Sequence, residues 1–207
     1  MAKIKICGIT NKEDAAWVAN LAADYLGIVF AKDSKRNVSE KTALEIVQAV
    51  PAYLEKVGLF VNEDPKVVLK ILSLCKLNVL QFHGEESPEY CQQFKGQAQI
   101  IKAFRIKDAS TLEQMPRYDV DFYLLDAYVE GEQGGTGATF NWDLALKAKE
   151  LGKPIFLAGG LTVENVAEAI KKVQPYAVDV SSGVEASPRR KDIGLMQQFI
   201  QKVEKVG

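Results

Sequence analysis

The feature that most restricts the fold is a regular alternation of short apolar runs and amphipathic helical stretches along all 207 residues. Several apolar runs are continuous, which is typical of parallel strands buried on both faces. Strict alternation leaves two α/β architectures, a doubly wound open sheet and a closed (β/α)8 barrel. A count of eight strand–helix units favours the barrel, so we predict one TIM-barrel domain over residues 1–207. The predicted strands are Ile4–Cys7, Tyr25–Phe30, Leu54–Val61, Val79–Phe82, Gln99–Phe104, Phe122–Leu125, Pro154–Ala158 and Ala177–Val180.

Residues typical of helix N-termini follow the predicted strands. Thr10-Asn11-Lys12-Glu13 has the Thr-x-x-Glu pattern of a capping box, with Thr10 as the cap. The other expected helix starts are Ser39, Asp64 with Pro65, Ser87 with Pro88, Asp108, Asn141, Thr162 and Asp192.

Charge and hydropathy exclude several classes of protein. The formal net charge is −1 and hydrophobic residues make up 47% of the chain, as in an ordinary soluble protein. The run Arg189-Arg190-Lys191 is too short for a nucleic-acid patch and fits either a solvated loop or a local anion contact. No apolar run approaches the roughly 20 residues that span a bilayer, and Lys3–Ile6 alternates lysine with isoleucine, unlike a signal peptide. We therefore expect neither a nucleic-acid nor a membrane partner.

Cysteine and histidine usage points away from disulfides and zinc. The three cysteines, Cys7, Cys75 and Cys91, form an odd and sparse set, which favours a reducing compartment. With the single histidine, His83, and no Cys-x-x-Cys pair, no zinc site of ordinary ligand spacing can form. The sequence predicts a cytoplasmic protein without a metal site.

Two glycine-containing loops predict a phosphate site. In a (β/α)8 barrel the active site lies at the C-terminal ends of the strands. Gly159 and Gly160 follow the seventh predicted strand, and Ser181-Ser182-Gly183 follows the eighth. Glycines let backbone N–H groups close on an anion, and these two loops are a frequent phosphate site in this fold. Tight turns between strand and helix are the alternative explanation for the glycines.

A long loop follows the sixth predicted strand. It contains Gly134-Gly135-Thr136-Gly137, which favours a mobile lid or a third phosphate contact, with a flexible surface loop as the alternative. Asp126 comes directly before this loop. Its carboxylate is a candidate general acid or base at the barrel mouth, or else a structural cap for the loop.

Three further side chains lie at or after the ends of predicted strands, and each has a functional and a structural interpretation. Cys7 ends the first strand and is either a catalyst or a small buried hydrophobe. Arg36 lies after the second strand and is either solvated or a bidentate partner for a carboxylate or phosphate. His83, close to Gln81, is a candidate proton carrier or a hydrogen-bonded loop residue.

Short motifs are spread in a characteristic order along nearly the whole chain. They are Lys5–Thr10, Gly58–Asn62, Leu80–Gly84, Leu124–Asp126, Gly134–Gly137, Phe140–Trp142, Leu157–Leu161 and Asp179–Glu185. Leu157–Leu161 alone would occur in many phosphate-binding barrels. Together the motifs resemble the phosphoribosylanthranilate isomerase family.

The resemblance implies a cofactor-free Amadori rearrangement of a small phosphoribosyl substrate. The aminoaldose N-(5-phosphoribosyl)anthranilate becomes the corresponding 1-amino-1-deoxyribulose 5-phosphate. An acid protonates the furanose ring oxygen and opens the ring to a Schiff base, and a base then removes the C2 proton. The resemblance makes Asp126 the acid and Cys7 the base, and the first and sixth strands can place them across the barrel mouth. We expect nearby positive charge or dipoles to lower the pKa of the thiol.

The same resemblance assigns binding residues. Arg36 would face the anthranilate carboxylate, and Asp179 would orient the sugar hydroxyls or support the site. The phosphate cradle would be formed by Gly159, Gly160, Ser181, Ser182 and Gly183, and the other substrate-binding residues would be Gln81, His83, Gly135 and Gly137.

Two departures from the family pattern and two rival functions remain. Lys35 stands where the family usually has proline, and Pro188–Asp192 lacks the usual glycine before Lys-Asp. One rival is the aminoaldose isomerase of histidine biosynthesis, whose two-fold repeated barrel binds two phosphates; Phe60–Asp64 here has no Gly-Gly pair to match the later cradle. The other is a non-catalytic barrel that binds a phosphate ligand, which the presence of both Cys7 and Asp126 disfavours. The sequence leaves a monomer and a homodimer equally open.

Overall fold

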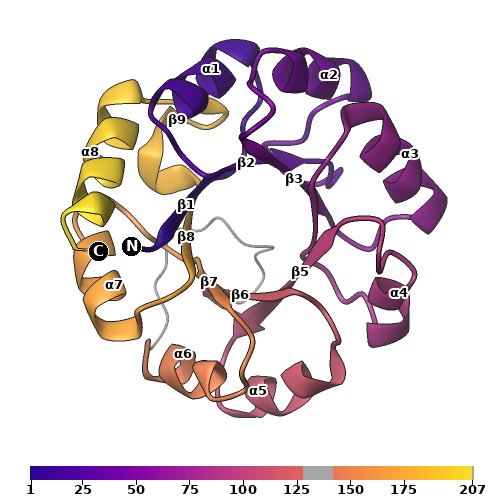
Figure 1. Cartoon of the computed structure of the whole chain (residues 1–207), viewed down its shortest axis with the longest axis vertical. Coiled ribbons are helices and arrows are strands. Elements are labelled where there is room, and N and C mark those ends of the chain that lie inside the picture. The colour runs from indigo at the N-terminus through magenta and orange to yellow at the C-terminus, as the bar shows by residue number, and fades with distance from the viewer. Residues whose placement is uncertain (128–141, 207) are drawn as a thin grey trace.

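Eight parallel strands close into a barrel in the computed structural model, which describes residues 1–127 and 142–206. The strands follow one another in chain order, and β1 pairs with β8 to close the ring. This closure confirms the predicted (β/α)8 barrel and rules out the open sheet. Helices cover the outside of the barrel, and the two chain ends lie near each other (Figure 1). The strands are β1 (Lys3–Ile6), β2 (Tyr25–Val29), β3 (Glu55–Phe60), β4 (Val79–Phe82), β5 (Gln99–Ile106), β6 (Phe122–Ala127), β7 (Ile155–Leu157) and β8 (Ala177–Val180).

The helices alternate with these strands as the pattern predicts. Their bounds are α1 (Lys12–Asn20), α2 (Glu40–Gln48), α3 (Pro65–Cys75), α4 (Pro88–Gln92), α5 (Ser110–Gln114), α6 (Trp142–Lys149), α7 (Val166–Val173) and α8 (Ile193–Glu204), with short 3-10 turns η1 (Met115–Arg117) and η2 (Ser182–Val184). None of the helices described is long and apolar enough to cross a membrane.

Four of the eight predicted helix starts are confirmed as side-chain caps, whereas α5 begins at Ser110, shortly after Asp108, without a side-chain cap. Ser39, Asp64, Ser87 and Asp192 each accept a hydrogen bond from a backbone N–H of the first helical turn. These side-chain oxygens satisfy donors that the helix itself leaves free. Asn141 lies outside the described residues.

Two predicted caps are wrong. Asn11, not Thr10, caps α1, because its Oδ1 accepts from Asp14 N at 2.8 Å while Thr10 Oγ1 donates to Arg189 O at 2.6 Å. Thr162 does not cap α7, which begins only at Val166 after Asn165. In both places a tertiary or loop contact takes the threonine away from the helix end.

Strands β5 and β6 extend further than their predicted apolar runs. β5 continues to Ile106 and β6 to Ala127, because Arg105 pairs with Asp126 and Ile106 with Ala127 in the ladder. Asp126 therefore lies inside β6 rather than after it. A polar side chain at the mouth of a barrel does not end the strand, since backbone hydrogen bonds continue beneath it.

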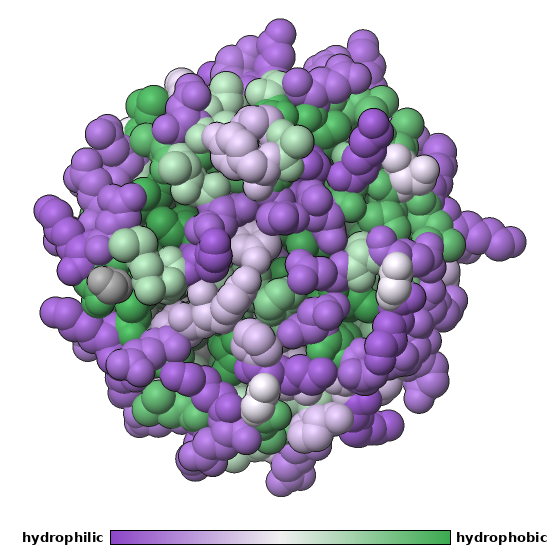
Figure 2. Space-filling model, in the orientation of Figure 1, coloured by the Kyte–Doolittle hydropathy of each residue, from purple (hydrophilic) through white to green (hydrophobic). Residues whose placement is uncertain are grey.

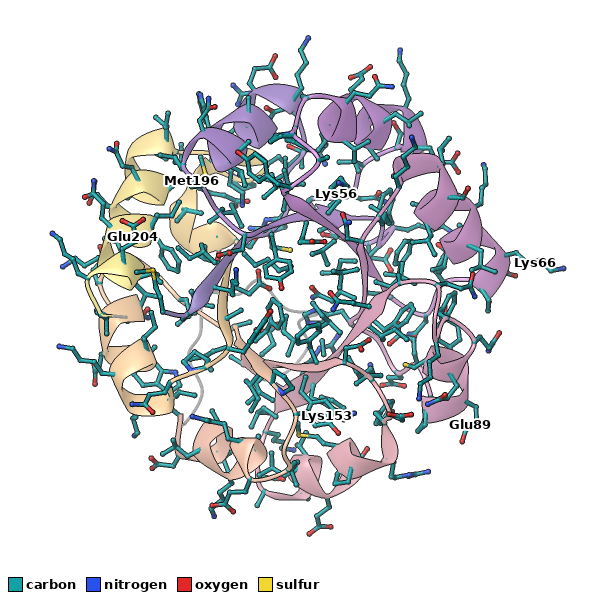
Figure 3. All side chains as sticks on the ribbon, in the orientation of Figure 1. Lys56, Lys66, Glu89, Lys153, Met196 and Glu204 are labelled. Carbon is teal, nitrogen blue, oxygen red and sulfur yellow. The ribbon has the colours of Figure 1, made fainter. Side chains whose placement is uncertain are left out.

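Aromatic rings fill the barrel at the N-terminal ends of the strands. Tyr25 and Phe122 each make edge contacts with Phe156, with ring centroids 5.2 Å and 5.3 Å apart. Tyr176 stacks on Phe122, and its hydroxyl lies 3.1 Å from that of Tyr25. Side-chain sticks crowd the inside of the barrel (Figure 3), and polar residues dominate the outer edge of this face of the molecule (Figure 2). The aromatic layer forms a floor below the cavity described next.

A small hairpin follows β8 that the sequence pattern did not predict. Its strands are β9 (Glu185–Ser187) and β10 (Arg190–Lys191), paired antiparallel. Lys191 N donates to the buried Asp14 Oδ2 of α1 at 2.9 Å. This bond fixes the hairpin against the first strand–helix unit, beside the barrel mouth.

Candidate active site

A cavity of about 710 Å³ opens at the C-terminal ends of the strands. Most of the residues predicted for the site line it. They are Cys7, Arg36, Gln81, His83, Asp126, Gly159, Gly160, Asp179, Ser181 and Ser182. Gly135 and Gly137 lie outside the described residues, so their predicted role stays a prediction.

Cys7 stands directly beyond β1, with its backbone N–H bonded to Val180 O at 2.8 Å. Its side chain is buried against Val29 and Leu59. Gly27 of β2 leaves the space for the thiol, because a Cβ on Gly27 would lie 2.7 Å from Cys7 Sγ and 3.0 Å from its Cα. Sequence reasoning missed Gly27, although a glycine inside a strand often marks such a close approach.

The environment of the Cys7 thiol contains charges of both signs. Burial raises its pKa, the ammonium groups of Lys5 and Lys191 oppose that rise, and the Asp179 carboxylate adds to it. The net effect is a raised pKa, so the expectation of a lowered pKa is wrong for this arrangement. The predicted cations are present, but removal of the thiol from water outweighs them.

Asp126 ends a row of three polar side chains. Gln81 Nε2 lies 3.0 Å from His83 Nδ1, and His83 Nε2 lies 3.2 Å from Asp126 Oδ2. With the amide nitrogen facing Nδ1, that ring nitrogen accepts and Nε2 donates to the carboxylate. Asp126 Oδ1 accepts from the backbone N–H of Ala127 at 2.9 Å. His83 and the backbone of Ala127 thus hold one carboxylate oxygen each.

Gly159 brings the loop after β7 against this carboxylate. Its φ is +78°, and an added Cβ would lie 2.5 Å from Ala127 N and 3.1 Å from Asp126 Oδ1. Both the left-handed backbone and the close approach require glycine here. The loop of the predicted phosphate cradle is therefore packed on the predicted acid.

The two cradle loops touch each other. A Cβ on Gly183 would lie 2.0 Å from Leu161 O, so only glycine allows this contact. Among the hydrogen bonds between described residues, none uses the N–H of Gly159 or Gly160, while Asn165 Nδ2 donates to Gly160 O at 2.8 Å. The loop is thus fixed through a carbonyl, and these N–H groups remain available.

Arg36 is already engaged by a carboxylate. Its Nε and Nη2 each donate to Glu185 at 2.7 Å, which forms a bidentate ion pair. Glu185 also accepts from Lys191 Nζ at 3.0 Å. Gly8 makes room for the arginine, because its Cβ would lie 2.4 Å from Arg36 Cδ. Glu185 fixes the guanidinium at the cavity wall, a role that sequence reasoning missed even though Glu185 closes one of the motifs.

Three buried polar atoms around the cavity have no partner among the described residues. They are Gln81 Oε1, Asp179 Oδ1 and Ser181 Oγ. The other Asp179 oxygen accepts from Lys5 Nζ at 2.9 Å. Buried polar atoms without partners are costly, so these three indicate where a ligand with hydroxyl groups would bind. No cluster of three or more His, Cys, Asp or Glu side chains within residues 1–127 and 142–206 is arranged to hold a metal ion.

Comparison with known proteins decides the family. Residues 4–202 match the family described as N-(5'phosphoribosyl)anthranilate (PRA) isomerase. The chain belongs to the phosphoribosylanthranilate isomerase family. It is 50% identical to the N-(5'-phosphoribosyl)anthranilate isomerase of Geotalea daltonii, over 99% of this chain and 97% of that protein.

Solved structures of phosphoribosylanthranilate isomerases share the whole fold. One is a complex with reduced 1-(o-carboxyphenylamino)-1-deoxyribulose 5-phosphate, at 38% identity and a TM-score of 0.90, covering 99% of this chain and 100% of that one. Another contains monomers of the dimeric enzyme from Thermotoga maritima, at 40% identity and a TM-score of 0.89, with the same coverage. The histidine-pathway isomerase and the non-catalytic barrel are not favoured.

One departure from the phosphoribosylanthranilate isomerase pattern has a visible structural cost. Arg189, in the segment expected to contain glycine, has φ +75°. A side chain is strained in this region, which glycine adopts freely. Arg189 Nη1 donates to the carbonyls of Lys35 and Asn37, both at 2.9 Å. Those bonds tie the hairpin to the loop that carries the other departure, Lys35.

Proposed function

We propose that this chain converts N-(5'-phosphoribosyl)anthranilate to 1-(2-carboxyphenylamino)-1-deoxyribulose 5-phosphate, the isomerase step of tryptophan biosynthesis. The observation that carries the proposal is one cavity lined by Cys7, by Asp126 and by two touching glycine loops. A related enzyme has been solved with a reduced form of this product. Two proton carriers and one anion cradle are the groups that the reaction needs.

Ring opening is assigned to Asp126. A carboxylic acid protonates the furanose ring oxygen, the C1–O bond breaks, and the anilino nitrogen supplies electrons to form the protonated Schiff base. The carboxylic acid form of Asp126 supplies this proton. His83 Nε2 lies 3.2 Å from Asp126 Oδ2 and fixes the orientation of the carboxyl group. Asp126 is left as the carboxylate.

Proton abstraction is assigned to Cys7. The thiolate takes the C2 proton, the C2–H electrons form a C1–C2 double bond, and the iminium becomes an enolamine. Protonation of C1 and loss of the proton from the C2 hydroxyl then give the ketone at C2. β1 and β6 are separated by β7 and β8 in the barrel, so the base and the acid approach the sugar from different walls.

The two charged ends of the substrate, the phosphate and the anthranilate carboxylate, are assigned to different residues of the cavity. The phosphate would bind the N–H groups of Gly159, Gly160 and the Ser181–Gly183 segment, because the two loops converge there. The anthranilate carboxylate would meet Arg36, whose guanidinium keeps free N–H donors after its two bonds to Glu185. The unpartnered oxygen of Asp179 would accept a hydrogen bond from a ribose hydroxyl.

The decisive experiment is turnover by the purified protein. Anthranilate-ribosyl fluorescence should decay as product forms, and the gene should restore growth of a tryptophan auxotroph that lacks this isomerase. A histidine auxotroph that lacks the corresponding aminoaldose isomerase serves as the matched control strain. Rescue of the histidine strain alone, or product binding without any turnover, would each overturn the proposal.

Gly27→Ala should damage catalysis while leaving the barrel closed. The new methyl group would overlap the position of Cys7 Sγ, and a shift of the base by about 1 Å can cost about 10²-fold in rate. Overpacking should also lower stability by about 1–3 kcal/mol. The measurements are kcat and the midpoint of thermal unfolding.

Gly58→Ala is the matched control for Gly27→Ala. Its added Cβ would crowd Leu77 Cδ1 at 2.5 Å on the outside of the same sheet, away from the cavity. This variant should lose stability and keep its kcat. Equal loss of kcat in both variants would show that general strain, not the position of Cys7, is responsible.

Arg36→Ala should weaken use of the substrate. Loss of a charge-assisted contact costs on the order of 1.5–3 kcal/mol, which is about 10- to 150-fold in kcat/KM. Glu185 keeps its bond to Lys191, so the fold should survive. Steady-state kinetics should be compared with Arg190→Ala, an exposed arginine of β10. Unchanged kcat/KM would mean that the carboxylate is held elsewhere, with Lys35 and Arg105 as the candidates.

The cellular setting and assembly are also proposals. Three free, buried cysteines fit the reducing cytoplasm that the sequence predicts. A relative from Thermotoga maritima is described as dimeric and has been solved as monomers, so both states are compatible with this fold. Sedimentation of the purified protein would distinguish them.

A further inference from the structure

Lys5 enters the inside of the barrel directly below Cys7. The two residues are two positions apart on one chain segment, and side chains two apart in a strand point to the same face. In the ladder, Lys5 is the register partner of Asp179 on β8 and of Tyr25 on β2, whose ring lies in the barrel core. The side chain is fully buried, and its ammonium donates to Asp179 Oδ2 at 2.9 Å.

Lys5 differs from two other buried lysines, Lys56 and Lys102, in where its charge lies. Lys56 (labelled in Figure 3) reaches only the carbonyl of Leu54, at 3.3 Å. Lys102 bonds to Glu86 at 2.9 Å and to Gly84 O at 2.7 Å, which fixes the loop after β4. Neither faces the thiol, whereas the positive charge of Lys5 acts directly on Cys7 and lowers the pKa of its thiol against the rise caused by burial.

We propose that Lys5 is a positioning residue for the reaction: its buried ammonium, held by Asp179, holds the thiolate form of Cys7 ready as the base. This inference rests on the proposed role of Cys7. Lys5 does not touch the substrate and acts on the reaction through the sulfur of Cys7.

The charges that face Cys7 come from four parts of the chain. Lys5 is on β1, Asp179 on β8, Lys191 on β10 with its partner Glu185 on β9, and Arg36 in the loop after β2. β2 itself presents Gly27 and Val29 to the thiol, and β3 presents Leu59. In their ordinary ionised forms these groups are three cations and two carboxylates. A thiolate makes the cluster neutral, whereas a thiol leaves one buried positive charge in excess.

Lys5 is better placed than Lys191 to keep its charge. Burial lowers the pKa of Lys191 overall, despite its bond to Glu185. Burial acts on Lys5 in the same direction, but the charges of Asp179 and Cys7, together with the hydrogen bond to Asp179, reverse the effect and raise the pKa of Lys5. Desolvated opposite charges interact strongly, so a fully buried ammonium beside the sulfur favours the thiolate more than an exposed one would.

The test measures the thiol directly and not only turnover. Iodoacetamide reacts with thiolates, and peptide mass spectrometry separates labelling at Cys7 from labelling at Cys75 and Cys91. Lys5→Met keeps the length of the side chain and removes the charge. At neutral pH it should slow labelling of Cys7 at least about tenfold and lower kcat/KM by a similar factor. Both rates should recover as pH rises, because a thiol with a raised pKa still ionises in base, and the Kd of product should hardly change.

Controls separate this role from a structural one. Lys56→Met removes another buried ammonium and should leave the labelling profile and kcat/KM unchanged. If Lys5→Met does not fold because Asp179 is left unpaired, Lys5→Met/Asp179→Asn compared with Asp179→Asn alone carries the same test. A pH profile of Cys7 labelling that is identical with and without Lys5 overturns the proposal. A shifted labelling profile with unchanged turnover would instead overturn the role of Cys7 as the base.

Discussion

Cys7→Ala should fold and bind product but lose at least about 10²-fold in kcat, within the 10²–10⁴-fold range typical of a general base. The side chain lies at the end of β1, and the packing below it is provided by other layers of the barrel. Under the proposed mechanism, Asp126 would still open the ring without the sulfur, but no base would remove the C2 proton. The proposed phosphate and carboxylate contacts do not involve Cys7, so the Kd of product should change far less than kcat. Both should be measured on the same preparation, with circular dichroism to check the fold.

Cys75→Ala is the matched control for the loss of a buried thiol. Cys75 ends α3 and is buried outside the barrel. Burial raises the pKa of its thiol to about 11, and no cation offsets that effect. This variant should keep its kcat and lose only some stability. A general base typically contributes about 10²–10⁴-fold to kcat. If folded Cys7→Ala retains more than about a tenth of the wild-type kcat, the loss is smaller than this contribution and Cys7 is structural. The base would then have to be sought among Asp179, His83 and Asp126.

The strands were predictable where both faces of the sheet are buried. Val79–Phe82 and Ala177–Val180 match β4 and β8 at both ends, because an apolar run and a doubly buried strand have the same limits. β6 was predicted to end at Leu125, since Asp126 breaks the apolar run. Backbone pairing with β5 carries the strand onward, and a single sequence does not show its pairing partner.

The site residues divide in a similar way. Cys7 and Asp126 could be identified because each ends or interrupts an apolar run at the barrel mouth. Glu185 could not, since its contact with Arg36 joins positions 149 residues apart. Lys5 was included in an alternating N-terminal segment and in the motif Lys5–Thr10, but no role of its own was predicted for it. The available signal was its spacing of two residues from Cys7, because side chains two apart in a strand point to the same face.

Glycine positions show why the geometry was harder to predict than the composition of the site. Gly159 and Gly183 were expected to bind phosphate, and the structure gives them a second constraint as contact points with Ala127 and Leu161. Gly27 carries the same kind of constraint for Cys7. Each depends on an atom from a different strand–helix unit, so local sequence patterns do not reveal it.

Asp126→Asn should lose at least about 10²-fold in kcat while the cavity keeps its shape, because an amide cannot deliver the proton of a carboxylic acid. The backbone N–H of Ala127 can still donate to the remaining carbonyl oxygen. The new amide N–H would face the N–H of His83 Nε2, which places two donors together. The hydrogen bonds from Gln81 through His83 can, however, reverse their direction. Gln81 Oε1, which lacks a partner, can accept from Nδ1–H once the amide turns, and Nε2 then accepts from the new amide. The variant should therefore fold and bind product almost normally.

Side-by-side values of kcat and product Kd distinguish loss of the acid from loss of position. In Asp126→Asn, kcat should fall while the Kd of product stays near the wild-type value, whereas a disturbed cavity would weaken product binding as well. Asp119→Asn is the matched control. Asp119 is exposed, lies shortly before the N-terminal end of β6, and pairs with Lys95. It should retain both the wild-type kcat and the wild-type product Kd. A folded Asp126→Asn protein with near-normal kcat would contradict the assignment of the acid and point to His83 as the group that protonates the ring oxygen.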